Sequence, residues 1–251
     1  AVRLSDRHFG IGGDGIILVC PSKVADAKMK MYNLDGSEGK MCGNGIRCVG
    51  KFLYDHGMVD INEKDEITIE TLSGIKKLKA YTSGGKVNRL RVDMGKAILE
   101  PKEIPVVLDG DKVVDRPVEI AGKNYNITCV SMGNPHCVVF MDDIDNLDIE
   151  TVGPEFENDK LFPERVNTEF VTVLDDHTIK MRVWERGSGE TWACGTGACA
   201  VAVAACENGF CKKGEDIKIK LKGGDLIINY TDETVYMTGN AEKVFEGEVE
   251  V

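Results

Sequence analysis

Two short stretches of the sequence each place a cysteine directly before a Gly-x-Gly turn. Residues 41–50 read MCGNGIRCVG and residues 193–200 read ACGTGACA, which puts Cys42 and Cys194 in matching positions. Each cysteine precedes a predicted helix, and a helix N-terminus offers unpaired backbone N–H groups at the positive end of its dipole. A thiol in this position has a lowered pKa, and the unpaired N–H groups can bind a carboxylate. Each stretch therefore combines a candidate proton-transfer sulfur with a candidate anion site.

The two stretches belong to a longer duplicated pattern. Gly57 lies 15 residues after Cys42 and Gly209 lies 15 residues after Cys194, so each stretch predicts a helix that ends at a C′ glycine. Two copies of one αβ unit explain this agreement. The strands predicted after the helices are 65–72 and 76–82 in the first copy and 215–221 and 225–231 in the second.

Asn33 and Glu185 each lie nine residues before their cysteine, which extends the duplication upstream.

Composition distinguishes the two predicted helices. Residues 196–209, TGACAVAVAACENG, are small and apolar on every side, which indicates a helix enclosed by other structure. In the first helix, the residues expected to be buried are Ile46, Val49, Phe52 and Leu53, and those expected at a polar edge are Arg47, Lys51 and Asp55.

Most of the remaining sequence predicts strands, with one short helix over residues 149–157. A mostly β shell around a buried helix, built twice, gives an α+β protein with two pseudo-symmetric domains. The domains expected are residues 1–95 with about 240–251, carrying Cys42, and residues 96–239, carrying Cys194, with the boundary near 95–103. The other strands are expected at 15–20, 28–33, 88–94, 126–132, 136–141, 170–174 and 178–184.

Composition excludes several classes of function. The chain has 251 residues and a net charge of -11 with no dense basic block, so a nucleic-acid partner is not expected. No apolar run approaches the ~18–20 residues that span a bilayer, so no membrane association is expected. Nine cysteines without a C-x-x-C pair favour a reducing cytoplasm and no bound metal. GIGGDG at 10–15 precedes a strand-like segment, so no dinucleotide cofactor is expected.

Two such cysteines facing one substrate would invert a stereocentre. One sulfur, as thiolate, would remove a proton from one face of an α-carbon, and the other, as thiol, would return a proton to the opposite face. Backbone N–H groups would stabilise the charge that develops on the substrate carboxylate. In the alternative interpretation both cysteines only pack at a crowded helix start, and spacing alone does not separate the two. Cys48 and Cys199, in the same stretches, are assigned to packing.

Two further clusters favour chemistry over packing. GNPHC at 133–137 places His136 in a tight turn after a strand. WERGSGETWACG at 184–195 places Glu185, Arg186 and Glu190 before the second cysteine. Together they supply an acid–base partner and a cation next to a candidate thiol, and Glu190 receives no role.

The motifs MCGNGIRC, GNPH, RVN, ERGSGET and ACGTGACA, in this order along essentially the whole chain, resemble the diaminopimelate epimerase family. The resemblance implies an isomerase that uses no pyridoxal cofactor and converts LL- to meso-2,6-diaminopimelate in the cytoplasm, on the route to lysine and peptidoglycan precursors. It also implies two domains in which a mostly antiparallel, barrel-like β shell surrounds a central helix. The partner implied is a small amino-acid substrate, with a homodimer as the candidate assembly.

The resemblance also implies a role for individual residues. Cys42 and Cys194 match the acid–base pair, and His136 and Glu185 match residues that hold and tune the two thiols. Glu185 is also expected at the substrate. The other substrate-binding residues implied are the side chains of Asn33, Asn134, Asn167 and Arg186 and the carboxylate seats at Gly43, Asn44, Gly195 and Thr196.

The chain departs from the family pattern in two places. The family opens with a G-x-G-N-D segment, which this sequence lacks, and the sequence begins without methionine. Only 41 residues precede Cys42, whereas Asn134 lies 60 residues before Cys194, so residue 1 is not expected to be the native N-terminus. Gly15 stands where some family members carry Gln, which leaves the contact made at that position open.

Other classes remain open at this point. A proline racemase or hydroxyproline epimerase shares the two cysteines but carries His directly after the first Cys-Gly, where this chain has Asn44. A phenazine-biosynthesis relative shares the fold without the cysteine pair. A non-catalytic ligand-binding module would leave its ligand unchanged, so exchange of substrate hydrogen with solvent deuterium separates it from an enzyme.

Oxidation tests whether the two cysteines approach each other. Two sulfurs that flank one carbon come near the range in which a disulfide forms. An oxidant should therefore join Cys42 to Cys194 and abolish activity, and a reductant should restore it. Peptide mapping by mass spectrometry checks the link, and an oxidised, inactive sample with both thiols free would contradict the expectation.

Overall fold

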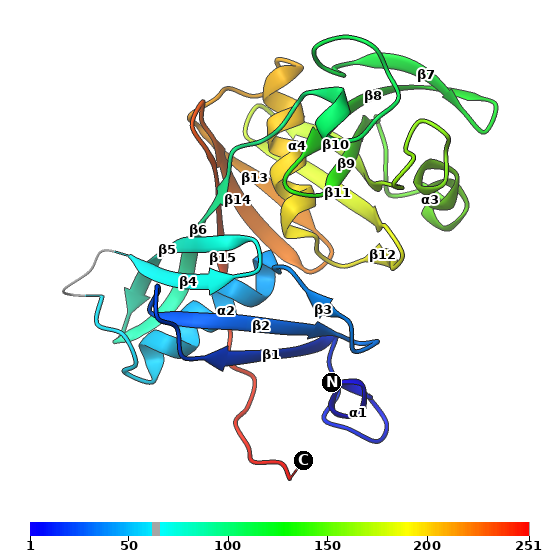
Figure 1. The fold of residues 1–251 in the computed structure, drawn as a ribbon. Coiled ribbons are helices and arrows are strands. Elements are labelled where there is room, and N and C mark those ends of the chain that lie inside the picture. Colours follow the sequence, from blue (N-terminus) through cyan, green and yellow to red (C-terminus); the bar gives the residue numbers. More distant parts are fainter. Residues whose placement is uncertain (62–65, 251) are drawn as a thin grey trace. The chain divides into compact units, whose positions relative to one another are not determined.

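The computed structural model describes residues 1–61 and 66–250, which fold into two compact units (Figure 1). Unit 1 contains Ala1–Asp93 and Thr238–Val251, and unit 2 contains Met94–Met237. Strands dominate both units and each holds one long central helix, so the predicted α+β class is confirmed. None of the helices in the described ranges is long and apolar enough to cross a membrane.

Unit 1 is a sheet with strand order β1-β2-β4-β5-β6, in which β3 pairs with β2. Neighbouring strands are antiparallel except β2 and β4, which are parallel and connected through α2. Helix α2 packs against β4 and β5. The elements are α1 (Val2–Ser5), β1 (Gly15–Cys20), β2 (Ala27–Asn33), β3 (Glu38–Gly39), α2 (Gly43–Asp55), β4 (Ile67–Thr71), β5 (Gly74–Ser83) and β6 (Lys86–Gly95).

Unit 2 is a sheet with strand order β14-β13-β11-β10-β9-β8-β7, in which β12 pairs with β11. Its helix α4 contacts β8, β9, β10, β13 and β14, so strands enclose it as its composition predicts. The elements are η1 (Pro101–Glu103), β7 (Arg116–Ile120), β8 (Lys123–Ser131), β9 (Pro135–Phe140), α3 (Ile149–Glu157), β10 (Asn167–Asp175), β11 (Thr178–Glu185), β12 (Gly189–Thr191), α4 (Gly195–Glu207), β13 (Asp216–Leu221) and β14 (Gly224–Tyr230). A last strand, β15 (Val235–Asn240), contains the boundary between the units.

The duplication predicted from the sequence is confirmed element by element. The series β2–β3–α2–β4–β5 in unit 1 matches β11–β12–α4–β13–β14 in unit 2. In both copies the longer strand before the cysteine runs parallel to the first strand after the helix: β2 pairs with β4, and β11 pairs with β13. Both helices have 13 residues. Gly57 (φ 64°) and Gly209 (φ 79°) follow the C-caps in the left-handed conformation expected of C′ glycines.

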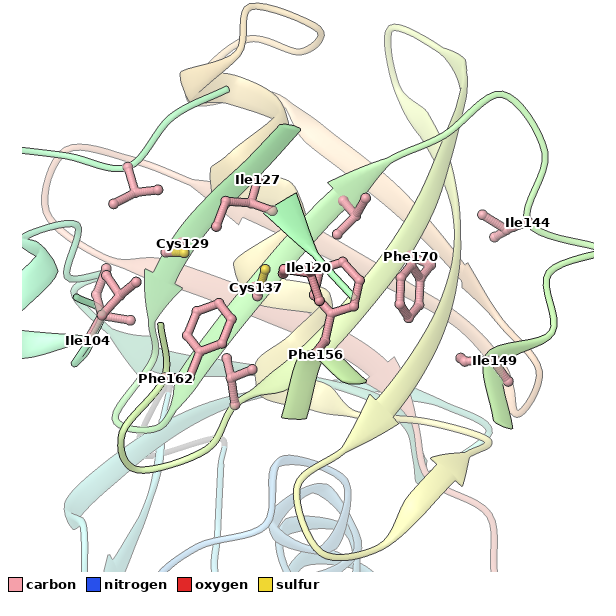
Figure 2. Packing of buried hydrophobic residues seen from close by; sticks show 14 residues of the cluster. Ile104, Ile120, Ile127, Cys129, Cys137, Ile144, Ile149, Phe156, Phe162 and Phe170 are labelled. Carbon is pink, nitrogen blue, oxygen red and sulfur yellow. The ribbon is translucent and has the colours of Figure 1, made fainter. Parts of the chain in front are cut away.

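Strands β9 and β10 have two buried faces, and this arrangement positions the site in unit 2. Successive side chains of a strand point to opposite faces of a sheet. One face carries Cys137 and Phe170, which join the apolar cluster beneath α3 shown in Figure 2. In that cluster Phe156 of α3 makes an edge contact with Phe170, with ring centroids 5.4 Å apart. The opposite face, toward α4, therefore carries the alternate residues, among them His136 and Glu169.

The predicted burial pattern of α2 is partly wrong. Ile46, Val49 and Leu53 are buried as expected, but Phe52 is 39% exposed. At about 100° per residue, Phe52 lies nearer the outer face of the helix than its neighbour Leu53 does. The outer face also carries Cys48, which is exposed, so the assignment of Cys48 to packing is wrong.

Arg47 was expected at a polar edge and is instead buried. Its Nη1 donates to the Gly43 carbonyl and its Nε donates to the Asn240 carbonyl, so backbone oxygens satisfy the guanidinium. In α4, Cys199 is buried, which confirms its assignment to packing.

We expect the C′ glycine of α4 to contribute through its backbone conformation alone. A Cβ at position 209 would meet nothing within 4 Å in the described part of the chain, so Gly209→Ala adds strain at positive φ without a clash. It should lower the free energy of unfolding by about 1 kcal/mol. Gly153→Ala is the contrast, because its Cβ would lie 2.3 Å from the Trp184 ring and should cost about 2 kcal/mol or more. Urea denaturation measures both values, and equal losses would contradict the expectation.

Candidate active site

Cys42 caps the N-terminus of α2. Its backbone is extended (φ −129°), and its Sγ accepts a hydrogen bond of 3.3 Å from the backbone N–H of Gly45. Gly43 and Asn44 form the first helical turn directly after it. The Oδ1 of Asn44 is buried and has no hydrogen-bond partner among the described residues. The first half-site thus combines a half-buried sulfur, a helix N-terminus and an acceptor that a ligand can satisfy.

Asn33 and Gly15 lie opposite each other in the first half-site, at paired positions of β2 and β1. Asn33 ends β2, and its Nδ2 donates to the Ser37 hydroxyl at 3.0 Å. Gly15 adopts φ +146°, and a Cβ there would lie 2.2 Å from the Tyr32 carbonyl oxygen. This backbone requires glycine, so a glutamine could occupy the position only after the strand shifts.

Cys194 caps α4 in the same way that Cys42 caps α2. Its Sγ accepts a hydrogen bond of 3.4 Å from the Gly197 N–H and lies 3.5 Å from the Thr196 hydroxyl. Only 6% of the residue is exposed. Gly195 and Thr196 provide the first turn of the helix. The second half-site repeats the first but encloses its sulfur more completely.

Polar side chains from β9 and β10 connect to the start of α4. His136 is the second residue of β9 and fully buried, so its predicted position in a turn is wrong by one or two residues. Its Nε2 lies 3.1 Å from Asn134 Oδ1, and Asn134 Nδ2 donates to Thr196 Oγ1 at 3.3 Å. The imidazole Nδ1 lies 2.7 Å from Oε1 of Glu169. The structure therefore brings His136, Asn134 and Thr196 into one network, as a shared site requires.

The remaining predicted residues of unit 2 flank this network. Glu185 ends β11, and its carboxylate accepts a hydrogen bond from the Thr191 hydroxyl. Asn167 begins β10, donates to the Pro135 carbonyl at 2.8 Å and accepts from the backbone N–H of Arg186 at 3.0 Å. The guanidinium of Arg186 is exposed and donates to the Glu164 carbonyl.

The pKa of Cys194 is raised well above its usual value, because burial disfavours the thiolate and the carboxylates of Glu185 and Glu169 repel it. The sequence-based expectation of a lowered thiol pKa is wrong for this cysteine. The hydrogen bonds from Thr196 and Gly197 lower the pKa, as expected at a helix N-terminus, but they are outweighed. Cys194 is therefore a protonated thiol at neutral pH and is suited to donate a proton.

Sequence reasoning did not find Glu169, which lies within a strand of apolar and hydroxyl-bearing residues. It left Glu190 without a role, and the structure gives it one: its carboxylate pairs with Arg182 at 2.8 Å and Lys222 at 2.7 Å. In residues 1–61 and 66–250 no group of three or more His, Cys, Asp and Glu side chains could hold a metal ion.

The sequence profile of the family described as diaminopimelate epimerase matches residues 1–100 and 128–244. The chain belongs to the diaminopimelate epimerase family. A relative of that name from Acetivibrio thermocellus is 54% identical over 253 residues, which cover 100% of this chain and 89% of the relative. A relative of the same name from Agathobacter rectalis is 52% identical over 260 residues, covering 100% of this chain and 90% of the relative.

Solved structures share the fold of this epimerase-family chain at lower identity. A probable proline racemase from Agrobacterium radiobacter matches with a TM-score of 0.71 at 18% identity, covering 95% of this chain and 77% of that one. A PhzF-family phenazine biosynthesis protein from Bacillus anthracis matches with a TM-score of 0.68 at 19% identity, covering 96% and 86%. At these identities the likeness concerns the fold alone.

Glu185→Gln should make Cys194 ionise at lower pH. The substitution removes a negative charge that raises the pKa of the thiol while keeping the size of the side chain. The pH midpoint of the rate of alkylation by iodoacetamide, followed at the Cys194 peptide by mass spectrometry, should therefore fall. Glu190→Gln is the matched control, since the Glu190 carboxylate is neutralised by Arg182 and Lys222. A midpoint that stays in place or rises in Glu185→Gln would show that this carboxylate does not act on the thiol.

Proposed function

We propose that this protein interconverts LL- and meso-2,6-diaminopimelate by proton transfer at one α-carbon between two cysteines, without a pyridoxal cofactor. The observation that carries the proposal is the repetition of one arrangement: Cys42 and Cys194 each cap a central helix in a duplicated unit. The identity of 54% to a relative named diaminopimelate epimerase, over the whole chain, supports the choice of substrate.

Inversion of a stereocentre needs a proton acceptor on one face and a proton donor on the other. In one direction the thiolate of one cysteine takes the α-proton, and the C–H electron pair moves into the substrate carboxylate. The second cysteine then gives its thiol proton to the opposite face. Because each turnover exchanges the protonation states of the two sulfurs, the reverse reaction uses the same groups in exchanged roles. The protonated state of Cys194 suits the donor in the direction in which Cys42 is the base.

The first turns of α2 and α4 are the proposed seats of the reacting carboxylate. Backbone N–H groups at Gly43, Asn44, Gly195 and Thr196 lie at positive helix ends, where they stabilise an anion. Their effect is greatest on the intermediate, whose carboxylate carries an additional negative charge.

The other site residues take roles according to their chemistry. We propose that His136 and Glu185 tune the two thiols and that Glu185 also contacts the substrate. The distal amino-acid centre of the substrate carries an ammonium and a carboxylate, which amide and guanidinium groups bind. The residues proposed for that end are Asn33, Asn134, Asn167 and Arg186.

A proline racemase-type activity is the second candidate, and Asn44 argues against it because that family carries His after the first Cys-Gly. We propose that the enzyme works in the cytoplasm. All nine cysteines are free, as a reducing compartment favours.

Cys42→Ser and Cys194→Ser should each abolish epimerisation, because a hydroxyl is hardly ionised at neutral pH and inversion needs both faces. Each variant should still exchange the α-proton of one stereoisomer slowly with deuterated water, and the two variants should prefer opposite isomers. The double variant should lose no more epimerisation than either single variant, since the two groups act as a unit.

The assay incubates LL-diaminopimelate in deuterated water and follows the meso product and the deuterium incorporated. Cys48→Ser is the matched control, because Cys48 is an exposed cysteine of the same helix as Cys42 and should retain near-native turnover. Near-native epimerisation by both single variants would refute the two-cysteine mechanism. Exchange with neither isomer of diaminopimelate in the unmodified protein would refute the substrate assignment.

A further inference from the structure

Glu169 is a buried carboxylate that the proposed proton transfers do not use. Glu169 and His136 are both 0% exposed, and Glu169 Oε1 lies 2.7 Å from His136 Nδ1. The second carboxylate oxygen, Oε2, has no hydrogen-bond partner in the described ranges 1–61 and 66–250. An ionised carboxylate with one unpaired buried oxygen is costly, and burial raises the pKa of Glu169.

The register of the sheet explains why this carboxylate meets the imidazole. β9 and β10 are parallel, and His136 is paired with Asn167, so Glu169 lies two residues further on the same face. The carboxylate also lies against α4, since a Cβ at Gly197 would come within 2.6 Å of Oε1. Glycine at position 197 therefore makes room for Glu169 beneath the first helical turn.

The hydrogen bonds around His136 fix where its protons lie. Asn134 uses its Nδ2 to donate to Thr196, which leaves Oδ1 as an acceptor facing His136 Nε2. Nε2 must therefore carry a hydrogen, because a carbonyl oxygen cannot donate. A further proton is then needed between Nδ1 and Glu169 Oε1, on either the imidazole or the carboxyl group. The pair holds two protons and has no net charge.

We propose that Glu169 is a positioning residue: it shares a second proton with Nδ1 of His136, which leaves the hydrogen on Nε2 and thereby sets the direction of a hydrogen-bond relay through Asn134 and Thr196 to Cys194 Sγ. The catalytic role of this relay rests on the proposed function, whereas its hydrogen-bond geometry is independent of that function. Thr196 accepts from Asn134, so its own hydroxyl hydrogen is free to point to the sulfur 3.5 Å away. If Nε2 lost its hydrogen, Asn134 would have to turn its amide, and Thr196 would donate to Asn134 instead of to the sulfur.

The titratable groups around the relay come from several elements. Besides His136 of β9, the Glu185 carboxylate at the end of β11 acts on both Glu169 and Cys194, and raises the pKa of each. Burial raises the pKa of the Cys137 thiol of β9 well above its usual value, and the Glu169 carboxylate raises it further. The Glu185 carboxylate therefore favours the protonated forms of both Glu169 and the Cys194 thiol.

Two substitutions at Glu169 separate the relay from simple packing. Glu169→Gln keeps a donor for Nδ1, because its amide N–H can replace the shared proton. Glu169→Leu fills similar space but leaves Nδ1 without a partner. Glu157→Leu is the matched control: Glu157 is another buried carboxylate of unit 2, held by Trp184 and the Gly187 N–H, and it does not contact His136.

Nitrogen-15 NMR of the histidine side chains in the full chain reads the protonation of both ring nitrogens from pH 5 to 9. We expect His136 to keep a protonated Nε2 over this range in the unmodified protein, in Glu169→Gln and in Glu157→Leu. In Glu169→Leu both neutral tautomers should appear, because nothing then shares a proton with Nδ1 and the Asn134 amide can turn. A bare Nε2 in the unmodified protein, or an unchanged His136 spectrum in Glu169→Leu, overturns the proposal.

Turnover provides the second readout. Glu169→Leu should lower kcat by about tenfold or more with little change in KM, since loss of a group that holds a catalytic histidine in one tautomer can cost far more than that. Glu169→Gln should stay within about threefold of the unmodified protein. An equal loss in Glu157→Leu would show that stability alone explains the effect and would overturn the proposal. If the unmodified protein does not epimerise diaminopimelate, the proposed function fails, while the NMR result still decides the relay.

Discussion

The first turn of each central helix packs closely against side chains of its sheet at its third position, which is a glycine in both copies. A Cβ at Gly45 would meet the Ile17 side chain at 2.3 Å, and a Cβ at Gly197 would meet Glu169 at 2.6 Å. The backbone N–H groups of the same two glycines donate to the sulfurs of Cys42 and Cys194. A side chain at either position would have to displace the sheet side chain opposite it. Glycine at both positions therefore lets each sulfur accept its capping hydrogen bond while the first turn stays packed against the sheet.

Two opposing electrostatic effects act on the sulfur of Cys194. The helix N-terminus and the Thr196 hydroxyl favour the thiolate, and such effects at a helix end are worth about 0.3–1 kcal/mol when exposed. Burial and two carboxylates oppose them, and full burial alone shifts a pKa by up to several units. The larger effects determine the result, so the enclosed cysteine holds its proton. The sequence motif identifies Cys194 as a helix cap. Burial and the carboxylates on the surrounding strands determine that its sulfur keeps its proton.

Local patterns in the sequence predicted the elements that carry the site. The C′ glycines, the short helix over Ile149–Glu157 and the strand over Gly15–Cys20 were all readable from periodicity and turn residues, because neighbours along the chain determine them. Glu169 was not readable, because a glutamate within a strand normally faces water and here α4 covers its face. The burial of Arg47 depends on a carbonyl 193 residues away. β7 was also missed, since RPVEI combines a proline with charged residues and its pairing with β8 is what orders it.

The two buried faces of β10 have a consequence for motion in unit 2. Phe170 is packed into the cluster beneath α3, and the adjacent Glu169 is held beneath α4. A strand fixed from both sides cannot slip by one residue, because a slip would exchange an aromatic ring for a carboxylate in each layer. Nor can it open toward one face without losing contacts on the other. The backbone amides from Thr168 to Val171 should therefore exchange with solvent only when the whole unit unfolds. The segment of β10 that carries Glu169 then belongs to the most slowly opening part of this unit.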